Sequence, residues 1–171
     1  DAAWDALIEF ENAPSTDKSH PAIQESIDHL SEIIQHKNAT RSSVDTLSPD
    51  ANAFIYYSSL NSDVLTIIEL LTPYLLDPGI SEPFLIYRNL LIAKENAGKI
   101  RGKLNGAIKE GVLNDIDHTN ISGYIQQHQY ALNIAKANAP EDIREQLLAM
   151  SNSNEYQMVK KVFNTLSSQE K

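Results

Sequence analysis

The segment YRNLLIAKENAGKIRGKLNGAIKEG, residues 87–111, has the spacing of apolar residues expected for a long amphipathic helix. Its inner seam alternates steps of three and four residues and consists of Tyr87, Leu90, Lys94, Ala97, Arg101, Leu104 and Ile108. Two cations, Lys94 and Arg101, occupy positions where a bundle helix normally buries apolar side chains. The segment therefore predicts a bundle helix that carries positive charge on its inner face.

Two earlier segments show the same spacing, and polar residues interrupt each of them as well. One seam consists of Ile23, Ile27, Leu30, Ile34, Lys37, Arg41 and Val44, and the other of Phe54, Tyr57, Asn61, Val64, Ile68 and Leu71. Strand-like alternation is absent from the sequence. Long helices joined by short connections are typical of up-and-down bundles. We therefore predict an all-α fold, an up-and-down antiparallel helical bundle with long helices.

Prolines mark most of the predicted helix starts, because a proline in the first turn removes no helical hydrogen bond. The prolines in this role are Pro21, Pro49, Pro83 and Pro140. The predicted helices cover residues 2–12, 21–46, 49–76, 83–111 and 119–138, a short helix from residue 140, and residues 154–168. No linker rich in proline or glycine divides them, so we predict a single helical domain over residues 1–171.

The composition is that of a globular protein, with 42% hydrophobic and 22% charged residues. A net charge of −9 without a basic stripe argues against binding to nucleic acid. The absence of cysteine excludes disulfides and thiolate chemistry and is compatible with a bacterial periplasm. The longest apolar runs, such as VLTII, are much shorter than a membrane span.

Sequence signals for catalysis and for metal binding are missing. His29 and His36 are seven residues apart, not the four that would place two metal ligands on one helix face. We expect the histidines to be solvated or to lie at helix ends. No nucleophile elbow, phosphate loop or dinucleotide fingerprint occurs. We therefore predict that the protein is not an enzyme and needs no cofactor or metal.

The charged seam residues have two interpretations. Lys94 and Arg101 are two turns apart, about 10 Å along the helix, and their long side chains can converge on one point. Together with Arg41 they predict an anion site inside the bundle, because arginine in a partly dry cavity holds small planar anions. In the alternative interpretation the cations reach solvent or pair with Glu95 or Asp63.

Three glycines, Gly98, Gly102 and Gly106, recur every fourth residue on one ridge of the same helix. Glycine costs about 1 kcal/mol relative to alanine inside a helix, so three of them need a compensating reason. We predict that a neighbouring helix packs closely along this ridge.

Two segments resemble the nitrate- and nitrite-sensing (NIT) domain family. The first, RSSVDTLSPDANAFIYYSSLNSDVLTIIELL at residues 41–71, is similar to the family's Arg-x-x-Val-Asp start and its helix with paired aromatics and a Ser/Thr-x-Leu-Asn/Ile step. The residues that match are Arg41, Val44, Asp45, Tyr56, Tyr57, Ser59, Leu60 and Asn61. In the second, Lys94, Glu95, Gly98 and Arg101 match the family's Lys-Glu-x-x-Gly-x-x-Arg helix. The resemblance covers residues 38–140.

The resemblance implies an all-helical ligand-sensing domain of a bacterial signal-transduction receptor, such as a methyl-accepting chemotaxis protein. It implies that a small anion, nitrate or nitrite, binds between helices, with Arg41, Asn61, Lys94 and Arg101 as the ligand-binding residues. Such domains stand in the periplasm as parts of inner-membrane proteins, or in the cytoplasm, and are often homodimers. We therefore expect flanking transmembrane segments and a signalling domain outside this sequence.

One position departs from the family pattern. Members often carry Glu-Arg-Gly-x-Ser near the first helix, whereas residues 11–15 read ENAPS, so Asn12 stands in place of an arginine. This substitution leaves the identity of the ligand open. The alternative function is a helical protein–protein interaction module without a small-molecule ligand. A closed cavity lined by the cations would favour the sensor, and an exposed apolar groove would favour the protein partner.

Overall fold

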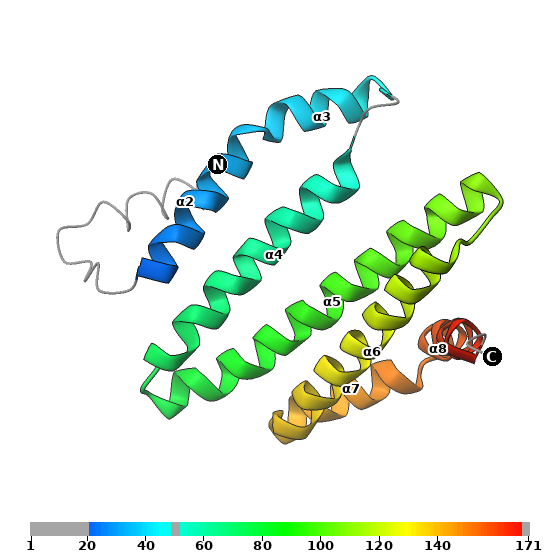
Figure 1. Cartoon of the computed structure of the whole chain (residues 1–171). Coiled ribbons are helices and arrows are strands. Elements are labelled where there is room, and N and C mark those ends of the chain that lie inside the picture. The colour runs from blue at the N-terminus through cyan, green and yellow to red at the C-terminus, as the bar shows by residue number, and fades with distance from the viewer. Residues whose placement is uncertain (1–20, 49–51, 169–171) are drawn as a thin grey trace.

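The computed structural model describes residues 21–48 and 52–168, and these residues form helices and connections without any strand (Figure 1). The helices are α2 Pro21–Gln35, α3 Lys37–Asp45, α4 Ala53–Leu71, the 3₁₀ turn η1 Thr72–Tyr74, α5 Pro78–Glu110, α6 Asp115–Asn138, α7 Glu141–Asn152 and α8 Asn154–Ser168. The predicted all-α class is confirmed. The predicted helix over residues 2–12, together with Asn12 and Pro49, lies outside the described residues.

The long helices run antiparallel to their neighbours, as predicted for an up-and-down bundle. In Figure 1, α2 lies beside α4, α4 beside α5, and α5 beside α6, and the direction of the chain reverses at each step. The two last helices, α7 and α8, pack on α6. None of the described helices combines the length and the apolar character needed to span a membrane.

The longest helix, α5, begins five residues earlier than predicted. Asp77 caps it, because its side chain accepts a hydrogen bond from the Gly79 backbone N–H at 2.8 Å, and Pro78 occupies the first turn. Pro83 therefore lies inside the helix, where it removes one backbone hydrogen bond without ending the helix. At the other end, Gly111 adopts φ 71° and closes the helix as predicted.

The start of α6 was also predicted too late, at residue 119 instead of Asp115. The Asn114 side chain accepts a hydrogen bond from the Asp117 backbone N–H at 2.8 Å and forms the cap. Asp115 and Asp117 add negative charge near the positive end of the helix dipole. Residues assigned to a connection thus form the first turn of the helix.

The predicted helix over residues 21–46 is two helices, α2 and α3, that meet at a turn at His36. At this turn the His36 N–H bonds to the carbonyl of Ile33, three residues back rather than four. No residue of α3 is buried, so packing does not hold α3 in line with α2.

Buried apolar residues form clusters on both sides of α4 and α5. Ile27, Leu30 and Ile67 join α2 to α4. Two larger clusters join α5 to α6 and the last two helices; their buried residues are Ile86, Ala93, Ala131, Leu132, Ala135, Ala139 and Leu147 in one, and Ile100, Ile121, Ile125, Phe163 and Leu166 in the other. None of the three clusters bridges α4 and α5, and the contact between these two helices is less extensive than that of α2 with α4 or of α5 with α6.

Candidate functional site

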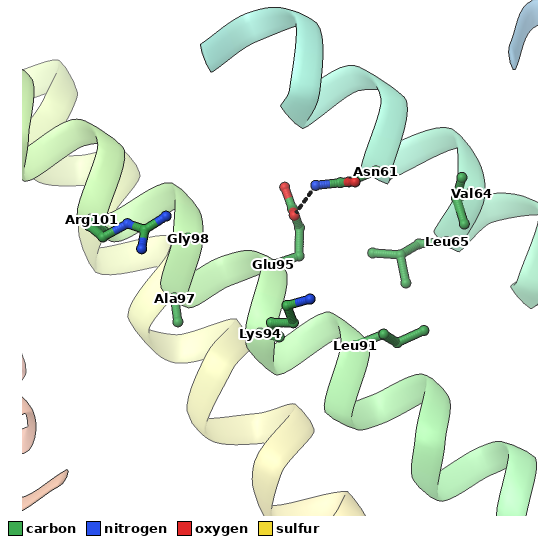
Figure 2. Close-up of a pocket in the computed structure, with 9 residues that line it drawn as sticks. All are labelled: Asn61, Val64, Leu65, Leu91, Lys94, Glu95, Ala97, Gly98 and Arg101. Carbon is green, nitrogen blue, oxygen red and sulfur yellow. Dashed lines mark hydrogen bonds between the residues drawn. The ribbon is translucent and has the colours of Figure 1, made fainter. Parts of the chain in front are cut away.

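A groove of about 560 Å³ lies between α4 and α5 (Figure 2). Three residues of α4 and six of α5 line it, namely Asn61, Val64, Leu65, Leu91, Lys94, Glu95, Ala97, Gly98 and Arg101. The groove lies between the two helices that no buried apolar cluster joins. It brings together three of the four residues predicted to bind a ligand: Asn61, Lys94 and Arg101.

One carboxylate, Glu95, faces this groove and is already paired. The Asn61 side-chain amide donates a hydrogen bond to Glu95 Oε2 at 2.6 Å, from α4 across to α5. Lys99 Nζ lies 3.7 Å from Glu95 Oε1, one turn along the same helix. Glu95 therefore has its own cation and donor, and it does not neutralise Lys94 or Arg101.

Lys94 and Arg101 have no ion-pair or hydrogen-bond partner within the part of the chain that the structure describes. The alternative expectation that Glu95 or Asp63 pairs with them is not met, because Asp63 Oδ2 lies 3.1 Å from His29 Nδ1. The expectation that the two cations are buried on an inner seam is wrong. Both side chains are exposed, as in the alternative interpretation in which the cations reach solvent, since the buried seam of α5 lies one residue away. They line an open groove and not the closed cavity that would favour the sensor.

Arg41 is not brought to the groove. It lies exposed on α3, outside the lining residues. Its positive charge lowers the pKa of the Tyr56 phenol on α4, but burial and the neighbouring Tyr57 raise that pKa more, so the net shift is upward. The Tyr56 hydroxyl is itself buried and has no partner among the described residues. The structure thus places Arg41 close to α4 from the side opposite the main bundle.

The three predicted ridge glycines differ in their surroundings. A Cβ on Gly102 would overlap the Phe54 ring, so the close approach predicted for the ridge exists there. Gly98 and Gly106 have nothing within 4 Å of such a Cβ. The ridge prediction is therefore correct at one position. At Gly98 the missing side chain leaves space in the groove beside Arg101 (Figure 2).

The contacts between α4 and α5 are spread along the groove. At the end near η1, Arg88 Nη2 lies 2.8 Å from Glu69 Oε1. The Asn61–Glu95 hydrogen bond lies in the middle, and Phe54 packs on Gly102 at the other end. Polar and aromatic contacts, and no buried apolar cluster, thus join the two helices along the groove.

One histidine, His128, is buried in mid-helix, which corrects the expectation that all histidines are solvated or lie at helix ends, whereas His118 lies in the first turn of α6 as expected. His128 is 8% exposed, and its Nδ1 donates to the Ala93 carbonyl at 2.8 Å, so α6 is tied to α5. His118 Nε2 donates to the Leu166 carbonyl at 2.7 Å and ties α6 to α8. No group of three or more His, Asp or Glu side chains is placed to hold a metal ion in residues 21–48 and 52–168.

The sequence interpretation missed part of the groove wall. Leu91, Glu95 and Gly98 stand beside the predicted seam rather than on it, at steps of three and four residues. This spacing is itself a helical ridge and was the available signal. The Lys-Glu-x-x-Gly-x-x-Arg pattern contains two of these three residues, so the resemblance pointed to the groove better than the hydrophobic seam did.

The described residues thus form an all-helical bundle with an open groove, lined by two cations that have no ion-pair partner among them. Residues 1–170 match the profile of the family described as "Nitrate and nitrite sensing". The chain therefore belongs to the NIT family of sensing domains found in signalling proteins. A search among curated proteins found no match, and neither did a search among solved structures.

Proposed function

We propose that this domain is the ligand-sensing part of a bacterial signal-transduction receptor, such as a methyl-accepting chemotaxis protein. It binds a small planar anion, nitrate or nitrite, in the α4–α5 groove. The observation that carries the proposal is that Lys94 and Arg101 line one groove and have no ion-pair partner among the described residues, while the carboxylate that lines it, Glu95, is paired with Asn61 and Lys99. Membership of the sensing family supports the same ligand class.

The chemistry of the groove suits such an anion. The Arg101 guanidinium presents two parallel N–H donors that match two oxygens of a planar anion, and Lys94 adds a point charge. The Glu95 carboxylate accepts a hydrogen bond from the Asn61 side-chain amide and pairs with Lys99. Arg41 lies outside the groove, so it does not contact the anion in this arrangement. We propose that it contacts the anion only if α3 moves over α4.

An anion in this groove contacts the side chains of both helices, and it would favour one spacing of α4 and α5 over another. The ligand can shift that balance only by its difference in affinity for the two spacings. We place the domain in the periplasm, between transmembrane segments of an inner-membrane receptor, and as a homodimer. The absence of cysteine from the sequence agrees with that compartment. The sequence of the whole gene and the mass of the purified domain in solution test these points.

The test of the ligand is calorimetric titration of the domain with nitrate and nitrite. Arg101→Gln and Lys94→Gln should each weaken nitrate binding by about 10- to 100-fold, because each removes one charge-assisted contact. Lys109→Gln is the matched control: Lys109 lies on the same helix outside the groove, and its loss should leave the affinity unchanged. Equal effects of all three variants would refute the site, since they would reflect net charge alone. If no heat or melting shift appears with either anion, the inorganic-anion function is wrong.

A further inference from the structure

The groove between α4 and α5 is much larger than an inorganic anion. Its volume is about 560 Å³. A water molecule takes up about 30 Å³ in the liquid, so nitrate, with four heavy atoms, fills on the order of 100 Å³. Pockets of roughly 300–1000 Å³ are the size that organic ligands use. An inorganic anion held by the cations would leave most of the groove to water.

The groove also has two chemically different ends. Figure 2 shows Arg101 at one end, Lys94 near the middle, and Val64, Leu65 and Leu91 together at the other end. The apolar end receives side chains from both helices and contains no charged residue. Val64 remains 40% exposed, so this apolar surface is open to solvent rather than used in the core. Covering such a surface with a hydrocarbon is favourable.

We propose that this groove also binds a carboxylate with a short apolar body. Its carboxylate binds at Lys94 and Arg101, and its hydrocarbon lies against Val64, Leu65 and Leu91. Lys94 is three residues, about 4.5 Å along the helix axis, from Leu91, so one short molecule reaches both regions. This inference rests on the proposed function, because it uses the same two cations. It differs in the ligand class and in the second half of the groove.

The first experiment compares a ligand that has both a carboxylate and an apolar body with two ligands that have only one of these features. The whole domain is titrated by calorimetry with hexanoate, with acetate as the charged head alone, and with 1-hexanol as the apolar body alone. Hexanoate should bind about tenfold more tightly than acetate and than hexanol, since only hexanoate fills both ends. Hexanoate binding no more tightly than acetate would overturn the inference.

The second experiment uses Val64→Thr, which replaces a methyl by a hydroxyl at nearly constant shape. It should weaken hexanoate binding several-fold and leave nitrate binding unchanged. Val159→Thr is the control, because Val159 has a similar exposure, 42%, and lies on α8 outside the groove. A loss of equal size for hexanoate and nitrate, or an equal effect of the control, would overturn the inference.

These outcomes separate the two proposals. Nitrate binding that depends on Arg101, without any advantage for hexanoate, retains the proposed function and removes the carboxylate inference. Hexanoate binding that depends on both Arg101 and Val64 supports the inference whether or not nitrate binds. If neither anion binds, the anion site itself is wrong, and both proposals fall.

Discussion

The two faces of α5 differ in almost every physical respect. The face toward α6 buries Ile86, Asn89, Ala93, Asn96 and Ile100, which follow steps of three and four residues. The face toward α4 carries Arg88, Glu95 and Gly102, which contact Glu69, Asn61 and Phe54 of α4. Lys94 and Arg101 are exposed beside this face and line the groove. One helix therefore carries a closed seam and an open seam side by side. The closed seam determines where the helix lies, and this leaves the open seam free to bind something else.

The difference between the two faces of α5 follows from how each face is packed. The α5–α6 interface has two apolar clusters and the His128–Ala93 hydrogen bond, so it holds without help from α4. The α4 side depends on a few contacts and on the α2–α4 cluster. Substitutions on the two faces of α5 should therefore differ in kind: one face controls stability, and the other controls the groove.

The largest expected difference between the two faces comes from deleting apolar side chains. Ile100→Ala, at a position only 2% exposed, should lower the free energy of unfolding by about 2–5 kcal/mol. Leu91→Ala, on the half-buried groove wall, should lower it by about 1 kcal/mol. Urea unfolding followed by circular dichroism measures both. Equal losses would show that the groove is as well packed as the α6 side.

Glycine substitutions sharpen the comparison along the open face. Gly106→Ala should raise the free energy of unfolding by up to about 1 kcal/mol, because its Cβ meets nothing and alanine favours the helix. Gly102→Ala should lower it by about 1 kcal/mol, since Phe54 must give way. Thermal melting of the two variants checks the signs. A gain at Gly102 equal to that at Gly106 would mean that Phe54 does not pack on α5.

A pH effect should arise on the packed side from Tyr156. Burial raises the pKa of its phenol above 10.0. The unfolded chain then loses the proton first, so this contribution to stability is complete below pH 10.0 and is lost as the pH rises through the higher folded value. In Tyr156→Phe, unfolding free energies measured on both sides of pH 10.0 should fall less steeply than in the parent. An unchanged slope would assign the alkaline loss to other groups.

The smallest effect is expected where α3 meets α4. Arg41→Gln removes a charge that lowers the pKa of Tyr56, so that pKa should rise further. Tyr156, which lies on the packed side and has no such contribution from Arg41, is the internal reference. Carbon NMR of labelled tyrosine across the alkaline range measures both. A Tyr56 pKa that does not move would place Arg41 away from α4.

The sequence predicted the fold better than the faces of its helices. The predicted seam over residues 23–44 is correct in α2, where Ile27 and Leu30 are buried, and wrong in α3, where Arg41 and Val44 are exposed. The seam of α5 was wrong by one residue, because Asn89 and Asn96 look like surface residues. Inside the bundle their amides donate to the carbonyls of Leu85 and Ile92, four residues back in their own helix. The Asn96 side-chain oxygen is buried without a partner among the described residues. A pattern based on residue type cannot recognise amides whose N–H groups bond within their own helix.

The candidate site was predictable in part. The seven-residue spacing on one helix sufficed to predict that Lys94 and Arg101 lie on the same side of that helix. The resemblance to the family pointed to Asn61 as a third residue of the site. The pairing of Glu95 with Asn61 depends on how α4 approaches α5, and local sequence does not encode that approach. The position of Arg41 depends on the turn at His36, which lacks the proline or glycine that usually marks a break. The ligand-binding roles of these residues stay predictions.

The uninterrupted length of α5 has a mechanical consequence. Its 33 residues form a rod about 50 Å long, and after Pro83 no residue interrupts it. This helix packs along α6, and the hydrogen bond from His118 to Leu166 joins α6 to the last turns of α8. When such a long helix tilts by a few degrees about its centre, its centre hardly moves, whereas its ends move by ångströms. If a ligand in the groove tilts this helix, its two ends will therefore move furthest.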